Sequence, residues 1–109
     1  MSLSRPPVAV MAIAILYVVV GAAGFVAHFR DLGAPETKWI LLTEALAVVA
    51  GVFMLLGHNW ARWLAVAWMA FHVVISYPVI REIAIHSLIL AAIAWLLFRP
   101  AARAWFRSA

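Results

Sequence analysis

The stretch VAVMAIAILYVVVGAAGFVAH, residues 8–28, decides the fold of this chain, because it contains no Asp, Glu, Lys or Arg. A helix needs about 20 mostly apolar residues to cross the hydrocarbon core of a bilayer, whereas the apolar part of a signal peptide has about 7 to 15. We therefore predict that this stretch is a membrane-spanning helix rather than a signal sequence.

The composition of the whole chain is typical of a membrane protein. Of its 109 residues, 69% are hydrophobic and 11% are charged. A water-soluble domain of this size needs polar residues over its whole surface, so lipid is the expected outer solvent. The chain has no cysteine, which excludes disulfides, thiolate metal sites, iron–sulfur clusters and covalently attached haem.

Two segments of turn-forming residues separate the first span from the next two. The segment FRDLGAPETK, residues 29–38, combines a glycine, a proline and several charges, as expected for a loop that leads into a helix. A second span is predicted at residues 39–56. In the following GHNWAR segment, we expect Gly57 to cap the end of that helix and Asn59 to cap the start of a third span at residues 61–77.

The chain is predicted to turn back once more before its end. A continuous helix over residues 60–98 would be roughly 58 Å long at about 1.5 Å per residue, nearly twice the thickness of the hydrocarbon core. Pro78 and the adjacent charges Arg81 and Glu82 mark the turn, so a fourth span is predicted at residues 82–97. The fold class is then all-α, an integral membrane four-helix bundle.

The basic residues predict how this bundle, a single domain over residues 1–109, sits in the membrane. Residues 99–109 carry an arginine at every fourth position together with Trp105 and Phe106, as in an amphipathic helix lying on the membrane surface. The cations at that end of the predicted spans are Arg5, Arg62, Arg99, Arg103 and Arg107, and those at the other end are Arg30, Lys38 and Arg81. Because cytoplasmic segments carry the excess of Lys and Arg, both termini are predicted to be cytoplasmic. The cations are spread along the chain rather than clustered, so no nucleic-acid partner is expected.

Each predicted span carries one ionisable residue near the outer face. At about 1.5 Å per residue, these residues lie roughly 6 to 8 Å below the outer boundary, the first of them slightly shallower. They are His28, Glu44, His72 and His86. Ionisable residues within membrane helices are costly and usually face the interior of a bundle. We therefore expect all of them to share one polar layer.

Small and polar residues recur at helical spacing on the faces that carry these ionisable residues. Small side chains on such a stripe let neighbouring helices approach closely. The residues predicted to line the cavity around the layer are Tyr17, Gly21, Gly24 and Ser76.

Imidazole and carboxylate groups at one depth are suited to holding a metal ion or a metal-containing cofactor. We predict that the layer binds a transition metal ion such as Zn, Cu or Fe. Two histidines on neighbouring antiparallel helices are also suited to ligate a haem iron or a chlorophyll-type magnesium. The layer would then be a cofactor site rather than a part of the packing.

Other functions remain open from the sequence. The chain could be a proton-linked transporter or channel in which Glu44 titrates, working as a homo-oligomer. It could also be an accessory subunit of a larger membrane complex, without chemistry of its own. In a purely structural alternative, the histidines donate to backbone carbonyls and Glu44 pairs with His72, Lys38 or Arg81. An enzyme acting on a soluble substrate is not favoured, because no Ser-His-Asp pattern, phosphate-binding loop or carboxylate pair is found.

Three segments carry a resemblance to known proteins. They are RPPVAVMAIAILYVVVGAAG, LLGHNWARWLAVAWMAFHVVIS and HSLILAAIAWLLFRPAARAWF. Together they resemble the small four-span bacterial inner-membrane proteins of unassigned function, chiefly in WARWL after a tight turn and LLFRP after the last span. The resemblance implies a bacterial inner-membrane location and no particular activity.

Overall fold

The computed structural model describes residues 5–106, and all regular structure in this range is helical. In chain order the elements are α1 (Val8–His28), the 3-10 helix η1 (Phe29–Asp31), α2 (Thr37–Leu55), α3 (Asn59–Ile75), α4 (Ile80–Phe98) and α5 (Pro100–Arg103). The all-α prediction is confirmed. The first predicted helix has its predicted ends, and the ends of the next three are shifted by one or two residues.

Three of the helices are long and apolar enough to cross a membrane, which indicates a multi-pass membrane protein. They are Val8–Asp31, in which η1 continues α1, Thr37–Leu55 and Ile80–Phe98. Helix α3 has 17 residues and falls short of this length. At about 1.5 Å per residue it covers roughly 26 Å, against about 30 Å of hydrocarbon.

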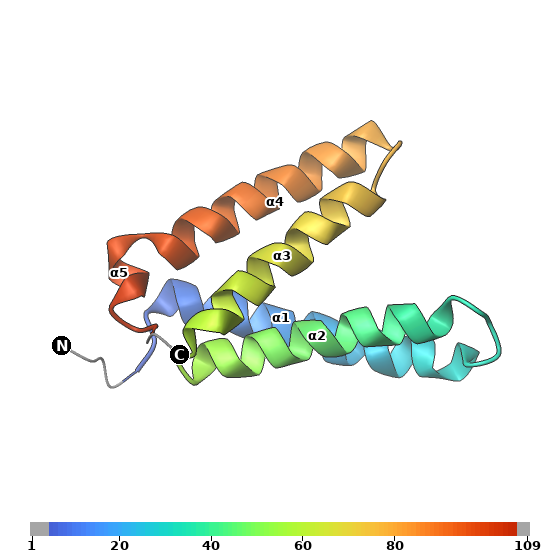
Figure 1. Cartoon of the computed structure of the whole chain (residues 1–109), viewed down its shortest axis with the longest axis horizontal. Helices are drawn as coiled ribbons and strands as arrows, with labels where there is room; N and C mark the ends of the chain where they lie inside the picture. Colours follow the sequence, from blue (N-terminus) through green and yellow to red (C-terminus); the bar gives the residue numbers. More distant parts are fainter. Residues whose placement is uncertain (1–4, 107–109) are drawn as a thin grey trace.

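The four long helices form two antiparallel hairpins that separate toward one end (Figure 1). Helices α1 and α2 lie side by side along their whole length, and α3 and α4 make the second hairpin. The hairpins are packed together near the α2–α3 turn and α5, which we call the closed end. They diverge toward η1 and the α3–α4 turn, which we call the open end.

Glycines let α1 and α2 pack closely. A Cβ atom on Gly21 would lie 2.6 Å from the main-chain oxygen of Glu44, and one on Gly51 would lie 2.6 Å from the main-chain oxygen of Ala14. Neither distance is tolerable for a carbon atom, so both positions require glycine. The small-residue stripe predicted on the first helix therefore works as a contact between the two helices.

The α2–α3 turn at the closed end ends α2 as predicted but starts α3 differently. Gly57 has a φ of 82°, and its N–H donates to the main-chain oxygen of Met54 while the N–H of His58 donates to that of Phe53. This pair of bonds is a Schellman motif, which favours glycine at its left-handed position. Asn59 is the first residue of α3 rather than its N-cap, and His58 holds the cap position.

The tail differs from the predicted surface helix. Its helix ends at Arg103, while Ala102 and Phe106 are buried and the Nε1–H of Trp105 donates to the main-chain oxygen of Met54 at 2.8 Å. The helical part of the tail is thus shorter than predicted, and one side of it packs under the closed end while Ala101 and Arg103 stay exposed. That the tail lies on the membrane surface stays a prediction. Arg107, the last arginine of the predicted pattern, lies outside the described residues.

Arg62 is buried at the closed end and links α3 to the end of α4. Its Nε–H donates to Asn59 Oδ1 at 2.7 Å, and its Nη1 donates to the main-chain oxygen of Leu97 at 3.0 Å. The guanidinium lies 4.3 Å from the ring centroid of Phe98. Because Leu97 is in the last turn of α4, its carbonyl has no partner within that helix, and Arg62 supplies one.

Candidate functional site

The first pair of ionisable residues lies on the α1–α2 hairpin. His28 ends α1, and its Nδ1 lies 2.9 Å from Glu44 Oε2 and 2.9 Å from the main-chain oxygen of Gly24. Gly24 leaves room for this pair, because a Cβ there would overlap the Glu44 carboxylate. In the described part of the chain the ion-pair partner of Glu44 is thus His28, and not one of the residues expected from the sequence.

The second pair lies on the α3–α4 hairpin and is joined through a serine. His86 Nδ1 lies 2.6 Å from Ser76 Oγ, and Ser76 Oγ donates to the main-chain oxygen of His72 at 2.7 Å. The ring centroids of the two histidines are 6.4 Å apart. The α3–α4 turn brings them together, because it places the last turn of α3 beside the second turn of α4.

A single metal-binding layer is not assembled from these two pairs. Within residues 5–106, no three His, Asp or Glu side chains are grouped so that they could hold a metal ion. The two pairs lie on different hairpins, and these hairpins diverge toward the open end (Figure 1). Metal binding by all of these residues stays a prediction.

A cavity of about 500 Å³ lies in the cleft between the hairpins. Aliphatic residues of α1 and α4, with Met69 of α3, form most of its wall. Its polar lining residues are Glu44, His72 and His86, while Tyr17 and Trp68 contribute aromatic rings. Of the residues predicted to line a cavity, Tyr17 does so here, whereas Gly21 and Gly24 face α2.

A second cavity of about 400 Å³ lies between α2 and α3 on the other side of the cleft. Its lining includes His28, Glu44 and His72. Glu44 and His72 therefore border both cavities. They come from different hairpins and face the same cleft.

Two interhelical hydrogen bonds form the floor of the 500 Å³ cavity. The hydroxyl of Tyr17 donates to the main-chain oxygen of Ala65 at 2.6 Å, and Trp68 Nε1 donates to the main-chain oxygen of Thr43 at 2.7 Å. The two aromatic rings have centroids 5.3 Å apart. With their polar groups bonded to backbone, both rings offer apolar surface to the cavity.

Sequence reasoning did not place Trp68 among the site residues. The signal that could have found it is its spacing, because Trp68 lies four residues before His72 and so occupies the same helix face. Their ring centroids are only 3.9 Å apart. Trp68 thus packs against the ring of His72 and also lines the cavity.

The hydrogen-bond network assigns the ring protons of the two cavity histidines. His72 Nδ1 lies 2.9 Å from the main-chain oxygen of Trp68, which can only accept, so Nδ1 carries the proton. Ser76 donates its single proton to the oxygen of His72, so it accepts from His86 Nδ1. In the neutral rings, Nε2 of His72 and of His86 is then an acceptor. Neither Nε2 has a hydrogen-bond partner in the described part of the chain.

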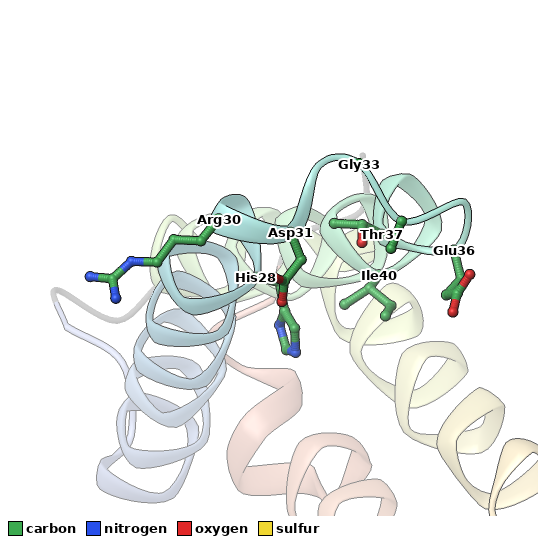
Figure 2. A pocket seen from close by; sticks show the side chains of 8 residues that line it. His28, Arg30, Asp31, Gly33, Glu36, Thr37 and Ile40 are labelled. Carbon is green, nitrogen blue, oxygen red and sulfur yellow. The ribbon is translucent and has the colours of Figure 1, made fainter.

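A separate, open depression of about 460 Å³ lies beneath the loop that joins α1 to α2 (Figure 2). Figure 2 shows Arg30 and Glu36 at opposite sides of it, with His28 pointing from α1 toward the bundle. The side chains of Arg30, Asp31 and Glu36 are exposed. We interpret this depression as a solvated loop surface, distinct from the cleft.

Comparison with known proteins found no match for this chain. The chain matches no protein-family model, and no curated protein or solved structure is significantly similar to it.

Proposed function

We propose that this is a four-span membrane protein that binds a lipophilic small molecule in the cleft between its two hairpins. The observation that supports this most is the cavity of about 500 Å³, with mostly apolar walls and a few polar groups. Small-molecule sites typically have volumes of about 300 to 1,000 Å³ and the same combination of an apolar lining with few polar groups.

The rim of the cavity supports a ligand that arrives from the lipid. Leu16 and Val20 of α1 and Ile89 of α4 line it, and their side chains are exposed. Around spanning helices such side chains meet acyl chains, so an apolar molecule has a lateral path into the cleft. A bound molecule would also cover polar groups that are costly to leave unpaired at membrane depth.

The path of the chain supports α3 as the fourth crossing. Helix α2 ends at the closed end and α4 begins at the open end, and both are apolar enough to span. Helix α3 connects these two ends, so it returns across the same layer despite its length. We further propose, from the bias of Lys and Arg and from the resemblance to small inner-membrane proteins, a bacterial inner membrane with both termini in the cytoplasm.

A pair of neighbouring valines provides the test. In lipid nanodiscs, tritiated para-nonylphenol should bind the unmodified protein saturably. Val20→Trp fills the cavity and should weaken binding at least about tenfold, because the added ring competes for the same space. Val19→Trp adds the same bulk to an exposed side chain outside the cavity lining and should leave binding unchanged. Equal binding by both variants would refute a site in the cleft.

A metal ion is the second candidate, and the histidine geometry favours it. Nδ1 of each of His28, His72 and His86 lies beside a carboxylate, carbonyl or hydroxyl oxygen. Metal-ligating histidines usually hold their second nitrogen in this way. Binding would require the hairpins to close until the Nε2 atoms meet.

Elemental analysis and zinc titration test this candidate. His72→Phe should lose the bound metal, while His58→Phe, which alters a histidine in the closed-end turn, should retain it. Protein that carries no metal and shows no saturable zinc uptake would rule this candidate out. Haem binding, proton-linked transport through Glu44, homo-oligomer formation and an accessory-subunit role stay predictions.

A further inference from the structure

We infer that the cleft selects a molecule whose head is an aromatic hydroxyl, a phenol-type group, over one whose head can only accept hydrogen bonds. This rests on the proposed function, because it concerns the ligand of the same cavity. The inference is based on unpaired hydrogen-bond acceptors that lie beside aromatic rings, on the open-end side of an apolar cavity.

The polar lining of the cavity consists of acceptors. Nε2 of neutral His72 and of neutral His86 is an acceptor, since Nδ1 of each ring holds its proton against an oxygen. The carboxylate of Glu44, the remaining polar lining group, accepts as well. A hydroxyl head can donate to one of these groups, whereas an ether or ketone has no donor for any of them.

The donors around the cavity are already committed. The Tyr17 hydroxyl bonds to the oxygen of Ala65, and the indole N–H of Trp68 bonds to the oxygen of Thr43. The Ser76 hydroxyl bonds to the oxygen of His72. A head that can only accept therefore finds no spare donor among these side chains.

The walls beside the acceptors favour an aromatic head. The ring of Trp68 contacts the rings of both Tyr17 and His72. Its centroid lies 5.3 Å from that of Tyr17 and 3.9 Å from that of His72. Aromatic rings gain energy from offset or edge-to-face contacts with one another, beyond the apolar surface they bury. A phenol ring placed against Tyr17 and Trp68 brings its hydroxyl toward the histidines.

A matched pair of probes tests the inference on the full chain in lipid nanodiscs. The probes are tritiated para-nonylphenol and tritiated para-nonylanisole, its methyl ether, which differs in having no hydrogen-bond donor. We expect the phenol to bind the unmodified protein at least about tenfold more tightly than the ether, because the ether has no donor for the acceptors that line the cavity. Partition of each probe into empty nanodiscs is subtracted.

A variant pair then assigns the preference to the cleft. His72→Phe keeps a ring but removes the acceptor, and should reduce the preference for the phenol to about threefold or less with little change in binding of the ether. His58→Phe should leave the preference intact. If the unmodified protein binds both probes equally, the head-group inference is wrong and binding in the cavity stands. If neither probe binds saturably, the proposed function fails as well.

Discussion

Tyr17 of α1 donates a hydrogen bond to the main-chain oxygen of Ala65 in α3, with an oxygen–oxygen distance of 2.6 Å. Both residues are buried, and the bond runs from one hairpin to the other at the floor of the cavity. It couples the position of α3 to that of α1 where the two hairpins meet. The angle of the cleft therefore depends on a polar contact as well as on apolar packing.

Tyr17→Phe should destabilise the protein by about 0.5 to 1.5 kcal/mol, the usual net contribution of one intramolecular hydrogen bond. The ring and its packing against Trp68 are retained, so the loss reports the hydroxyl alone. Denaturant unfolding in detergent measures it. Tyr77→Phe removes a hydroxyl from an exposed side chain and serves as the control. Equal unfolding midpoints for both variants would contradict a structural role for the bond.

Gly21→Ala should destabilise the α1–α2 hairpin, although alanine ordinarily favours a helix over glycine by about 1 kcal/mol. A Cβ at this position would lie 2.6 Å from the main-chain oxygen of Glu44, and overpacking costs about 1 to 3 kcal/mol. Because a backbone oxygen cannot move aside as the end of a side chain can, we expect the clash to outweigh the propensity in denaturant unfolding. Gly33→Ala, with nothing within 4 Å of its Cβ, should change stability little. A Gly21→Ala protein more stable than the unmodified one would overturn the close packing of α1 against α2.

The helices were predictable from local chemistry. Gly57 and Pro78 interrupt long apolar runs, and no tertiary contact was needed to place the turns near them. The pairing of Glu44 was less predictable, because depth along a helix does not say which neighbour a side chain meets. His28 is its partner because Gly21 and Gly24 bring α1 against α2.

The angle between the hairpins could not be predicted from the sequence. Equal depth placed the four ionisable residues in one layer, but depth is measured along each helix and carries no information on how far apart two hairpins lie. Contacts between the hairpins at the cavity floor set that separation, among them Trp68 with Thr43 and Tyr17 with Ala65. The arginine spacing of the tail likewise gave no sign that Phe106 is buried under the bundle.

Arg62→Lys should cost about 1.5 to 3 kcal/mol despite keeping the charge, since that is the usual contribution of hydrogen bonds to charged groups. Lysine lacks the planar fork that reaches Asn59 and Leu97 together, and it loses the flat contact over Phe98. Unfolding in detergent is again the measurement. Arg81→Lys alters an exposed arginine and should stay within about 0.5 kcal/mol of the unmodified protein. Matching effects at the two positions would show that Arg62 acts only as a charge.

Trp105→Phe should loosen the closed end, because Trp105 Nε1 donates to the main-chain oxygen of Met54 at 2.8 Å. That carbonyl lies in the last turn of α2, where the helix supplies no partner, although the N–H of Gly57 also reaches it. We therefore expect a loss of about 0.5 to 1.5 kcal/mol rather than the full cost of an unpaired carbonyl. Trp39→Phe makes the same change in an exposed side chain and should hardly change the free energy of unfolding. If limited proteolysis cuts the tail of Trp105→Phe no faster than that of Trp39→Phe, and their unfolding midpoints agree, the tail does not hold the closed end together.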